Sequence, residues 1–198
     1  MTTKSRQPLW NAAAVIAVIL SFGVRTPAAQ ATAPAANPDA AVVKDFLDRV
    51  NEYVALHKKL EATLPKLAKE STPDQIDKNQ RALAALIQSA RPKAQRGDLF
   101  TPQMAVIVKR VMASVFNGPE GQKLRSSIMD ENVAELPLKV NAQFPASIPI
   151  STMPPALLTA LPVLPEEMQY RFVASQFALL DPHANIVADF IPAVISIK

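Results

Sequence analysis

One stretch, from Val43 to Leu67, has apolar residues on a seven-residue repeat, and this repeat predicts a long amphipathic α-helix. The repeat consists of Val43, Phe46, Val50, Tyr53, Leu60, Leu64 and Leu67. His57 alone interrupts it, at the position where the next apolar residue is due. At 1.5 Å per residue this stripe is roughly 37 Å long. Later segments of the same chain therefore have to cover most of it.

The ends of this first helix can be predicted from its flanking residues. We expect it to span residues 39–69, with Asn37 or Asp39 as its N-terminal cap. Pro65 conflicts with a straight helix, because a proline in a helix interior removes one hydrogen bond and costs ~3 kcal/mol. We therefore expect a kink or an end near Leu64.

Two further helices are predicted from Thr-Pro start signals. Residues 72–75 read Thr-Pro-Asp-Gln, a capping box that begins a helix running to about Arg91, and Thr101-Pro102 begins the third helix in the same way. A shorter fourth helix is expected over residues 119–131. The predicted inward-facing residues are Ile76, Leu83, Leu86, Ile87 and Ala90 in the second helix, Met104, Ile107, Val108, Val111, Met112, Val115 and Phe116 in the third, and Leu124, Ile128 and Met129 in the fourth. The short turn after the first helix predicts that helices one and two are antiparallel neighbours.

Proline dominates the chain beyond residue 132. Seven prolines between positions 137 and 165 interrupt every helical pattern, so we expect a stiff extended segment with one helical turn at Pro155–Ala160. Two extended pieces, residues 138–141 and 148–151, are expected to lie along the helices.

After Pro165 the hydrophobic period changes from 3.6 to 2. Met168, Tyr170 and Phe172 alternate with polar residues, which predicts a strand with one buried face. Residues 177–180 and 186–190 form two more apolar runs, separated by an Asp-Pro-His-Ala-Asn turn. The pattern predicts a small antiparallel β-meander packed on helices, since such a meander is not stable alone.

These elements together predict an α+β protein, mainly α. It consists of an antiparallel bundle of three or four helices, a Pro-rich extended segment and a small C-terminal antiparallel β-meander. A single domain is expected over residues 39–198, divided into the helical part (39–131), the Pro-rich wrap (132–165) and the meander (166–192).

The N-terminal residues have the composition of a secretory signal peptide. Lys4 and Arg6 precede an apolar run that starts at Leu9, and Ala29-Gln30-Ala31 is a small-x-small cleavage site. We expect cleavage after residue 31, a disordered Ala/Pro spacer over residues 32–38, and a periplasmic or extracellular protein. An uncleaved membrane anchor stays as the alternative, although the run is short of the ~20 residues that a spanning helix needs.

Charge and cysteine content exclude several functions. The chain has no cysteine, which excludes disulfides, thiol nucleophiles and zinc ribbons. Without the leader's three basic residues, 18 basic residues face 17 acidic ones, so nucleic acid is not an expected partner. Residues 78–125 nevertheless hold nine basic residues against two acidic ones. This uneven charge is interpreted either as a solvated face or as a surface for an anionic part of the cell envelope.

Two segments resemble sequences of exported bacterial proteins of unknown activity. One is residues 97–102, Gly-Asp-Leu-Phe-Thr-Pro; the other begins at Leu164-Pro165-Glu166-Glu167, includes Tyr170-Arg171-Phe172-Val173 and ends with residues 181–192. Together with the leader, the layout is similar from end to end. The resemblance implies no reaction, ligand or partner, and it assigns no functional residue.

Candidate chemistry is sparse in this sequence. Only two histidines exist: His57 is expected in the core or at its boundary, and His183 on an exposed turn beside Asp181 and Asp189. A metal site needs several such groups to converge, and we predict neither a metal ligand nor a cofactor. Neither G-x-S-x-G nor S-x-x-K occurs, and the adjacent acids at residues 166–167 are a weak candidate for a carboxylate pair. No catalytic residue is therefore assigned.

The sequence favours a non-enzymatic interaction module of the cell envelope, with an envelope protein or an anionic envelope surface as partner. A hydrolase that uses two carboxylates on an envelope polymer is one alternative. A carrier of a small ligand or lipid is the other, and it requires an apolar cavity.

Overall fold

The computed structural model describes residues 37–131, 137–144 and 153–195. The predicted signal peptide, residues 32–36 of the predicted spacer and the extended piece at residues 148–151 lie outside these described residues. The last two residues of that spacer, Asn37 and Pro38, are described and form the start of the first helix. The described residues belong to one compact unit, Ala36–Lys198. Its elements are α1 (Pro38–Glu61), α2 (Pro73–Ala90), α3 (Pro102–Phe116), α4 (Gly121–Glu131), α5 (Pro155–Ala160), β1 (Gln169–Val173), β2 (Gln176–Asp181) and β3 (Ile186–Ile191).

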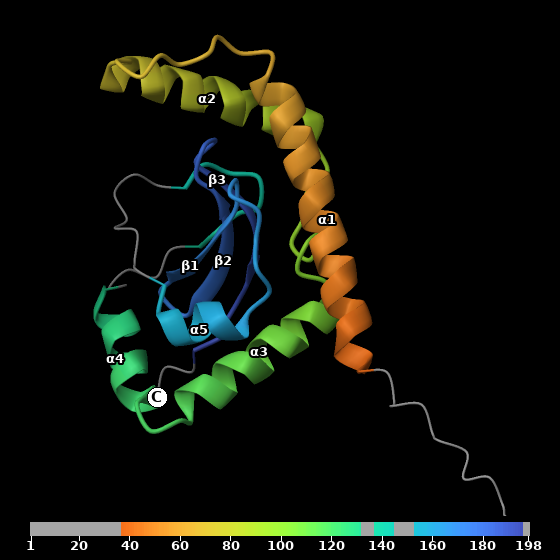
Figure 1. Ribbon diagram of the computed structural model, residues 1–198, viewed down its shortest axis with the longest axis vertical. Coiled ribbons are helices and arrows are strands. Elements are labelled where there is room, and N and C mark those ends of the chain that lie inside the picture. The colour runs from red at the N-terminus through yellow and green to blue at the C-terminus, as the bar shows by residue number, and fades with distance from the viewer. Residues whose placement is uncertain (1–36, 132–136, 145–152, 196–198) are drawn as a thin grey trace, which may run out of the picture. The chain divides into compact units, whose positions relative to one another are not determined.

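The predicted class, a helix-rich α+β protein, is confirmed. The helices lie around a three-stranded antiparallel sheet (Figure 1), and α1 makes contacts with both α2 and α3. The predicted antiparallel bundle is not confirmed, because α1 and α2 run in clearly different directions from the point where they meet. In the described part of the chain no helix is both long enough and apolar enough to cross a membrane.

Helix α1 begins as predicted but ends earlier. The side chain of Asn37 accepts a hydrogen bond from the backbone N–H of Asp39, and Pro38 occupies the first helical position. The helix ends at Glu61, close to the expected end near Leu64 and well before residue 69. Pro65 accounts for this end, because its ring would clash with the carbonyl of the residue four positions earlier, which is Glu61.

The apolar stripe of α1 is buried along its middle and exposed past the end of the helix. Phe46, Val50, Tyr53 and the interrupting His57 are all buried. The ring of Phe46 stacks on that of Phe100 with centroids 5.2 Å apart. The cover therefore comes from later segments of the chain, as predicted. Leu67, which lies beyond the helix, is nearly half exposed.

The Thr-Pro start signals of α2 and α3 are confirmed. Thr72 forms the predicted capping box with Gln75, and the Thr101 side chain accepts from the backbone N–H of Met104. Two inward predictions for α2 are wrong: Ile76 and Ala90 are exposed. The part of α2 that packs into the core is the stretch that holds Leu83, Ala84 and Ile87. The apolar residues in its first and last turns lie outside that contact and are therefore exposed to solvent. The buried residues of α3 are Met104, Ile107, Val108, Met112 and Phe116, in line with its predicted spacing.

The strands form the predicted meander, in the order β1-β2-β3, with all neighbours antiparallel. The register contains one irregularity: Leu179 pairs with Asp189 and Leu180 pairs with Val187, which leaves Ala188 as the extra residue of a β-bulge. The bulge reverses the alternation of β3, so that Asp189 faces the same side of the sheet as Leu179.

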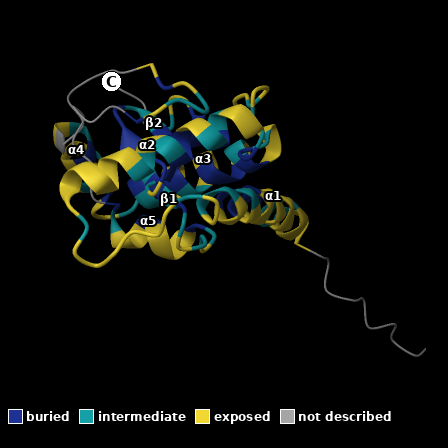
Figure 2. Ribbon diagram, turned by 90° about the horizontal axis from the view of Figure 1, so that it is seen from above, coloured by how far each residue is buried: buried dark blue, intermediate teal, exposed yellow. Residues whose placement is uncertain are grey.

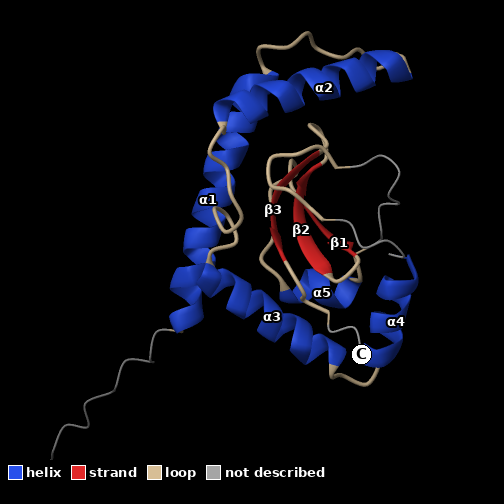
Figure 3. Ribbon diagram, turned by 180° about the vertical axis from the view of Figure 1, so that it is seen from behind, coloured by secondary structure: helices blue, strands red, loops and turns tan. Residues whose placement is uncertain are grey.

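Both faces of the sheet are buried, whereas the alternation predicted one. The aromatic residues Tyr170, Phe172 and Phe177 belong to the main core with the helices. The opposite face has its own small core, formed by Leu138, Phe144, Val173, Ala178, Leu180, Val187 and Phe190. Most residues of the strands are therefore dark blue in Figure 2, and the strands lie between the helices in Figure 3.

Residues 137–144 provide the cover on that second face. The backbone N–H of Asn141 donates to the Val187 carbonyl at 2.8 Å, and that of Phe144 donates to the Asn185 carbonyl at 2.8 Å. This segment was expected to lie along the helices. It does contact α2, because Gln88 donates to the Asn141 carbonyl at 3.1 Å. It also adds a short ladder to the edge of β3, because an uncovered edge would leave backbone groups of β3 unpaired.

Candidate metal centre

A buried carboxylate, Asp181, connects the sheet to α1. Asp181 ends β2 and faces the helices, in phase with Leu179, while Tyr53 and His57 lie one turn apart on α1 and point toward it. The Tyr53 hydroxyl donates to Oδ2 of Asp181 at 2.9 Å, and Nδ1 of His57 lies 2.6 Å from the same oxygen. The backbone N–H of Ala184 donates to Oδ1 at 2.9 Å and closes the β2–β3 turn. All three side chains are buried.

This contact fixes the proton of His57 on Nδ1. A carboxylate oxygen only accepts, so Nδ1 carries the hydrogen and donates it to Asp181. Nε2 then has a free lone pair in the neutral ring. Burial lowers the pKa of His57, but the hydrogen bond and charge of Asp181, together with Glu61 and Glu167, outweigh burial and raise it. Burial also raises the pKa of Tyr53, with a smaller contribution from the charge of Asp181.

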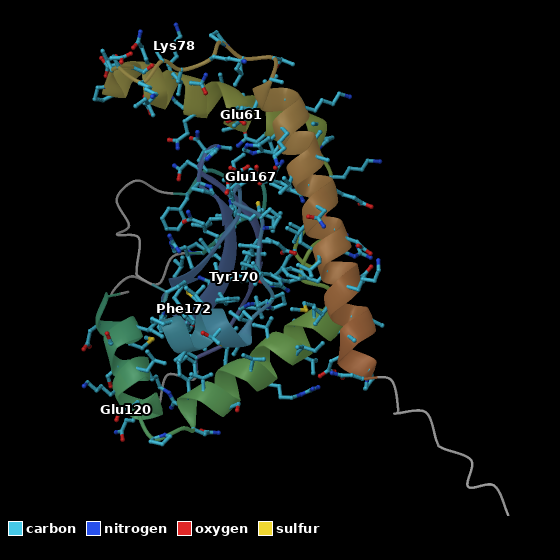
Figure 4. All side chains as sticks on the ribbon, viewed as in Figure 1. Glu61, Lys78, Glu120, Glu167, Tyr170 and Phe172 are labelled. Carbon is cyan, nitrogen blue, oxygen red and sulfur yellow. The ribbon has the colours of Figure 1, made fainter. Side chains whose placement is uncertain are left out.

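Of the two ring nitrogens of His57, Nδ1 has a partner and Nε2 is left without a hydrogen bond by the described residues. It is buried, and no described residue forms a hydrogen bond with it. Glu61 follows one turn later on α1 and places Oε2 3.4 Å from Nε2. His183, on the β2–β3 turn, places Nδ1 3.3 Å from Oε1 of Glu61, and the two imidazole rings have centroids 5.5 Å apart. Figure 4 shows Glu61 at the end of α1.

The three side chains have the spacing of a metal site. Each of His57, Glu61 and His183 offers one atom that can ligate a metal, and these three atoms lie within 4.8 Å of one another. A tetrahedral zinc ion with bonds of about 2.0–2.1 Å separates its ligand atoms by about 3.3 Å. Glu61 lies at this distance from each histidine, through Oε2 to Nε2 of His57 and through Oε1 to Nδ1 of His183. Side chains of Glu61 and His183 are 42% and 53% exposed, so an ion can reach the site from solvent.

The contact of His57 with Asp181 is of the kind that supports metal-binding histidines. A histidine that ligates a metal through one nitrogen usually donates its other N–H to a carboxylate, which holds the ring in place and makes the free nitrogen more basic. Asp181 provides this contact, and Tyr53 and Ala184 in turn hold Asp181. An imidazole in this setting is already oriented before any ion arrives.

A neighbouring ion pair holds the start of β1 against the same part of α1. Nζ of Lys58 lies 2.8 Å from Oε1 of Glu167, whose side chain is only 12% exposed. The hydrogen bond with Lys58 lowers the pKa of Glu167. Figure 4 shows Glu167 close to the end of α1 that carries Glu61. Glu167 is therefore a partner of Lys58 rather than part of a solvated strand start.

Asp189, which follows His183 closely in the sequence, is not part of the candidate metal site. Its Oδ2 accepts from the backbone N–H groups of Leu99 and Phe100 at 2.8 Å each, and its Oδ1 accepts from the N–H of Phe190. Gly97 donates to the same carboxylate at 3.1 Å from Oδ1, with the positive φ of 95° that glycine favours. Burial raises the pKa of Asp189 and these four N–H groups oppose that rise. Asp181, His183 and Asp189 thus do not form one ligand set.

Sequence reasoning placed both histidines correctly by environment, since His57 is buried and His183 is exposed on its turn. It did not bring them together, and it did not name Glu61. The His57-x-x-x-Glu61 spacing, which puts both side chains on one helix face, was the available signal. No sequence signal links His183 to that face.

Comparisons of this chain with protein-family models, with curated proteins and with solved structures find no match.

Proposed function

We propose that this chain is an exported protein that binds one divalent transition-metal ion, Zn²⁺ above all, through His57, Glu61 and His183. The observation that carries this proposal is the Nε2 atom of His57, which is buried without a hydrogen bond and aimed at a carboxylate. A lone pair facing a carboxylate is unfavourable unless a cation lies between them. A proton supplies one such cation, and a metal ion supplies one that also satisfies His183.

The donor set selects the class of metal. Two imidazoles and one carboxylate suit Zn²⁺, Cu²⁺ and Ni²⁺, whereas Ca²⁺ and Mg²⁺ prefer sites made of oxygen alone. Cu⁺ prefers thiolate and thioether ligands, and this chain has no cysteine. In an exported protein such an ion comes from outside the cytoplasm, which fits the predicted leader.

A bound ion would join two elements that are far apart in the sequence. His57 and Glu61 are on α1, and His183 is on the β2–β3 turn, so coordination would lock the end of the helix to the sheet. An ion that binds only the folded state raises the free energy of unfolding. The increase grows with the logarithm of the ion concentration divided by Kd. We therefore propose that the ion stabilises the fold and that its role is structural or regulatory.

Three protein ligands leave a tetrahedral ion one open position. Glu61 also borders a surface hollow of about 480 Å³, which Lys58 and Lys66 flank. These features support the interaction module that we expect from the sequence: a partner side chain would complete the coordination, and an acidic partner segment would suit the two lysines. The partner would be another protein of the envelope.

A metal-dependent hydrolase of an envelope polymer is the second candidate. Two histidines and a glutamate with an open position also form the ligand set of several catalytic zinc sites, where the fourth ligand is an activated water. This candidate replaces the hydrolase with two carboxylates expected from the sequence. Release of soluble fragments from purified envelope polymer, dependent on Zn²⁺ and lost in Glu61→Gln, would establish it.

Calorimetric titration of Zn²⁺ into untagged, chelator-treated mature protein tests the main proposal. We expect one ion per chain, and at least tenfold weaker binding for His183→Ala and for Glu61→Gln, because each removes one of three ligands. Both side chains are partly exposed, so these variants should fold. Glu52→Gln, an exposed acid on the same helix outside the cluster, is the matched control and should bind like the wild type.

The same variants give a second readout. Zn²⁺ should raise the thermal midpoint of the wild type and of Glu52→Gln, but not that of His183→Ala. Binding that is unchanged in both cluster variants would contradict the proposal, as would the absence of binding. Export is tested separately by the intact mass of protein recovered from the periplasm, which should begin at Thr32.

A further inference from the structure

A second candidate site lies at β1, away from the metal ligands. A pocket of about 470 Å³ opens there between the strand and the segment around α5. Its lining residues are Met153, Leu158, Pro162, Val163, Leu164, Met168, Gln169, Tyr170 and Arg171. The volume falls within the range of about 300 to 1,000 Å³ that is usual for small-molecule sites.

Arg171 is the one charged residue in this lining. Its Nη1 donates to the Tyr170 carbonyl at 2.8 Å, and its Nη2 donates to Oε1 of Gln169. Its Nε atom is buried and has no hydrogen-bond partner in the described part of the chain. Burial lowers the pKa of Arg171, and no carboxylate of the described residues opposes that shift. A half-buried guanidinium without a counter-ion is costly, and an anionic group in the pocket would remove that cost.

Apart from Gln169 and Tyr170, the rest of the pocket lining is apolar. Two of the lining residues are among the large apolar side chains that the described residues leave open to solvent: Leu158 is 47% exposed and Val163 is 87% exposed. Met153 and Met168 supply unbranched, adaptable side chains on the inner side. The site therefore combines one unpaired cation with a wall that gains from contact with a hydrocarbon.

We propose that this pocket binds the carboxylate of a free long-chain fatty acid, with Arg171 as counter-ion and the alkyl chain along the apolar wall. A guanidinium matches a carboxylate with two parallel hydrogen bonds, and Nε is the natural second donor for such a pair. The chain of the ligand would cover Leu158 and Val163. This second site does not depend on the metal centre.

Displacement of a fluorescent polyene fatty acid from the mature protein tests the proposal. We expect palmitate to displace the probe and methyl palmitate, which has the same chain without the charge, to be at least tenfold weaker. Arg171→Met should weaken palmitate binding at least tenfold, and Arg171→Lys should retain part of it. Arg96→Met removes an exposed arginine elsewhere and should bind like the wild type.

A further variant keeps the test valid if Arg171→Met does not fold. Val163→Asp changes a side chain that is almost fully exposed, so it should fold normally, and it should weaken palmitate binding by placing a charge on the wall. Equal displacement by the acid and its methyl ester would overturn the proposal. Binding to anionic phospholipid vesicles without binding of free palmitate would also overturn it, since the ligand would then be a membrane surface.

Chelation separates the two proposals. Palmitate binding should be the same with and without a chelator, and the same in His183→Ala as in the wild type. Loss of metal binding with intact palmitate binding would contradict only the metal proposal, and the reverse result would contradict only this one.

Discussion

Nδ1 of His57 lies 2.6 Å from Oδ2 of Asp181, although 124 positions separate the two residues in the chain. The contact explains why one polar residue interrupts the apolar stripe of α1. The sheet places a carboxylate at the level where the repeat would have another apolar residue, and a buried carboxylate needs donors. Tyr53, one turn earlier on the same stripe, supplies the second side-chain donor.

Asp181→Asn should destabilise the fold by about 3 kcal/mol, because breaking one partner of a buried charged pair typically costs 3–5 kcal/mol and the amide retains part of the hydrogen bonding. Asp181 accepts on both oxygens, so an asparagine must turn its NH₂ group toward at least one existing donor. Urea denaturation measures the change in free energy of unfolding.

Tyr53→Phe is the matched control, since it removes one donor to the same carboxylate without changing its charge. It should cost about 1 kcal/mol, the usual net value of a hydrogen bond. An Asp181→Asn variant that is no less stable than Tyr53→Phe would contradict the role given to this carboxylate.

Asp189→Asn should release the loop that precedes α3. The carboxylate of Asp189 accepts from the backbone N–H groups of Leu99 and Phe100, and asparagine cannot accept on both side-chain atoms. We expect a loss of about 1–3 kcal/mol, the cost of leaving buried donors unsatisfied. Hydrogen exchange of the Leu99 and Phe100 amides measures the effect directly, and both should exchange faster.

Asp98→Asn is the control for this loop, because Asp98 caps the N–H of Gln95 from a partly exposed position. Its effect on the Leu99 and Phe100 amides should be small. Equal protection of these amides in Asp189→Asn and in the wild type would show that the loop is held by other contacts. Asp189 and this loop are about 90 positions apart in the sequence, and the structure joins them through these hydrogen bonds.

Local signals were sufficient to predict most of the secondary structure. The Thr-Pro caps of α2 and α3 and the alternation in β1 depend on residues within one turn or one strand. The arrangement of the elements was harder to predict. The second face of the sheet is buried only because residues 137–144 return to pair with β3, and no local pattern signals a contact across that distance.

The candidate metal centre was hidden for the same reason. His57 stood out as a polar residue on an apolar stripe, but its partners Asp181 and His183 arrive through the packing of the sheet on α1. Asp189 shows a second limit. Its side chain reaches the helical side because of the bulge at Ala188, and a strict alternation would place it on the other face.

The chain's two tyrosines should stay protonated for as long as the fold persists. Burial raises the pKa values of both Tyr53 and Tyr170 above the ordinary value of about 10. A group whose pKa is higher in the folded state contributes stability below its unfolded pKa and loses it as the pH rises toward the folded pKa. Stability should therefore decline above about pH 10.

An alkaline titration checks this prediction with two signals. The ultraviolet absorbance of phenolate should rise only together with the loss of the circular dichroism of the helices. Tyr53→Phe, which leaves Tyr170 as the sole tyrosine, should show the same coincidence. A phenolate signal near pH 10 from a protein that is still folded would show that at least one phenol is open to solvent.

Among the glycines that the structure describes, Gly121 should tolerate a side chain least. It is the first residue of α4, and a Cβ added there would lie 2.0 Å from the carbonyl oxygen of Phe116 and 2.3 Å from its carbonyl carbon. Both are backbone atoms at the end of α3, so no side-chain rotation relieves the clash and the junction of the two helices has to shift. We expect Gly121→Ala to cost about 3 kcal/mol, at the upper end of what overpacking usually costs.

Gly118→Ala, in the same short connection, provides the comparison. Its added Cβ would lie 3.1 Å from the Val115 carbonyl oxygen, a tight contact that a small adjustment relieves, so the cost should stay below about 1 kcal/mol. Urea denaturation of both variants measures the difference. Because a shift of this junction makes local opening easier, Gly121→Ala should also speed proteolytic cleavage between the two helices. Equal stability of the two variants would mean that the junction is looser than its backbone contacts indicate.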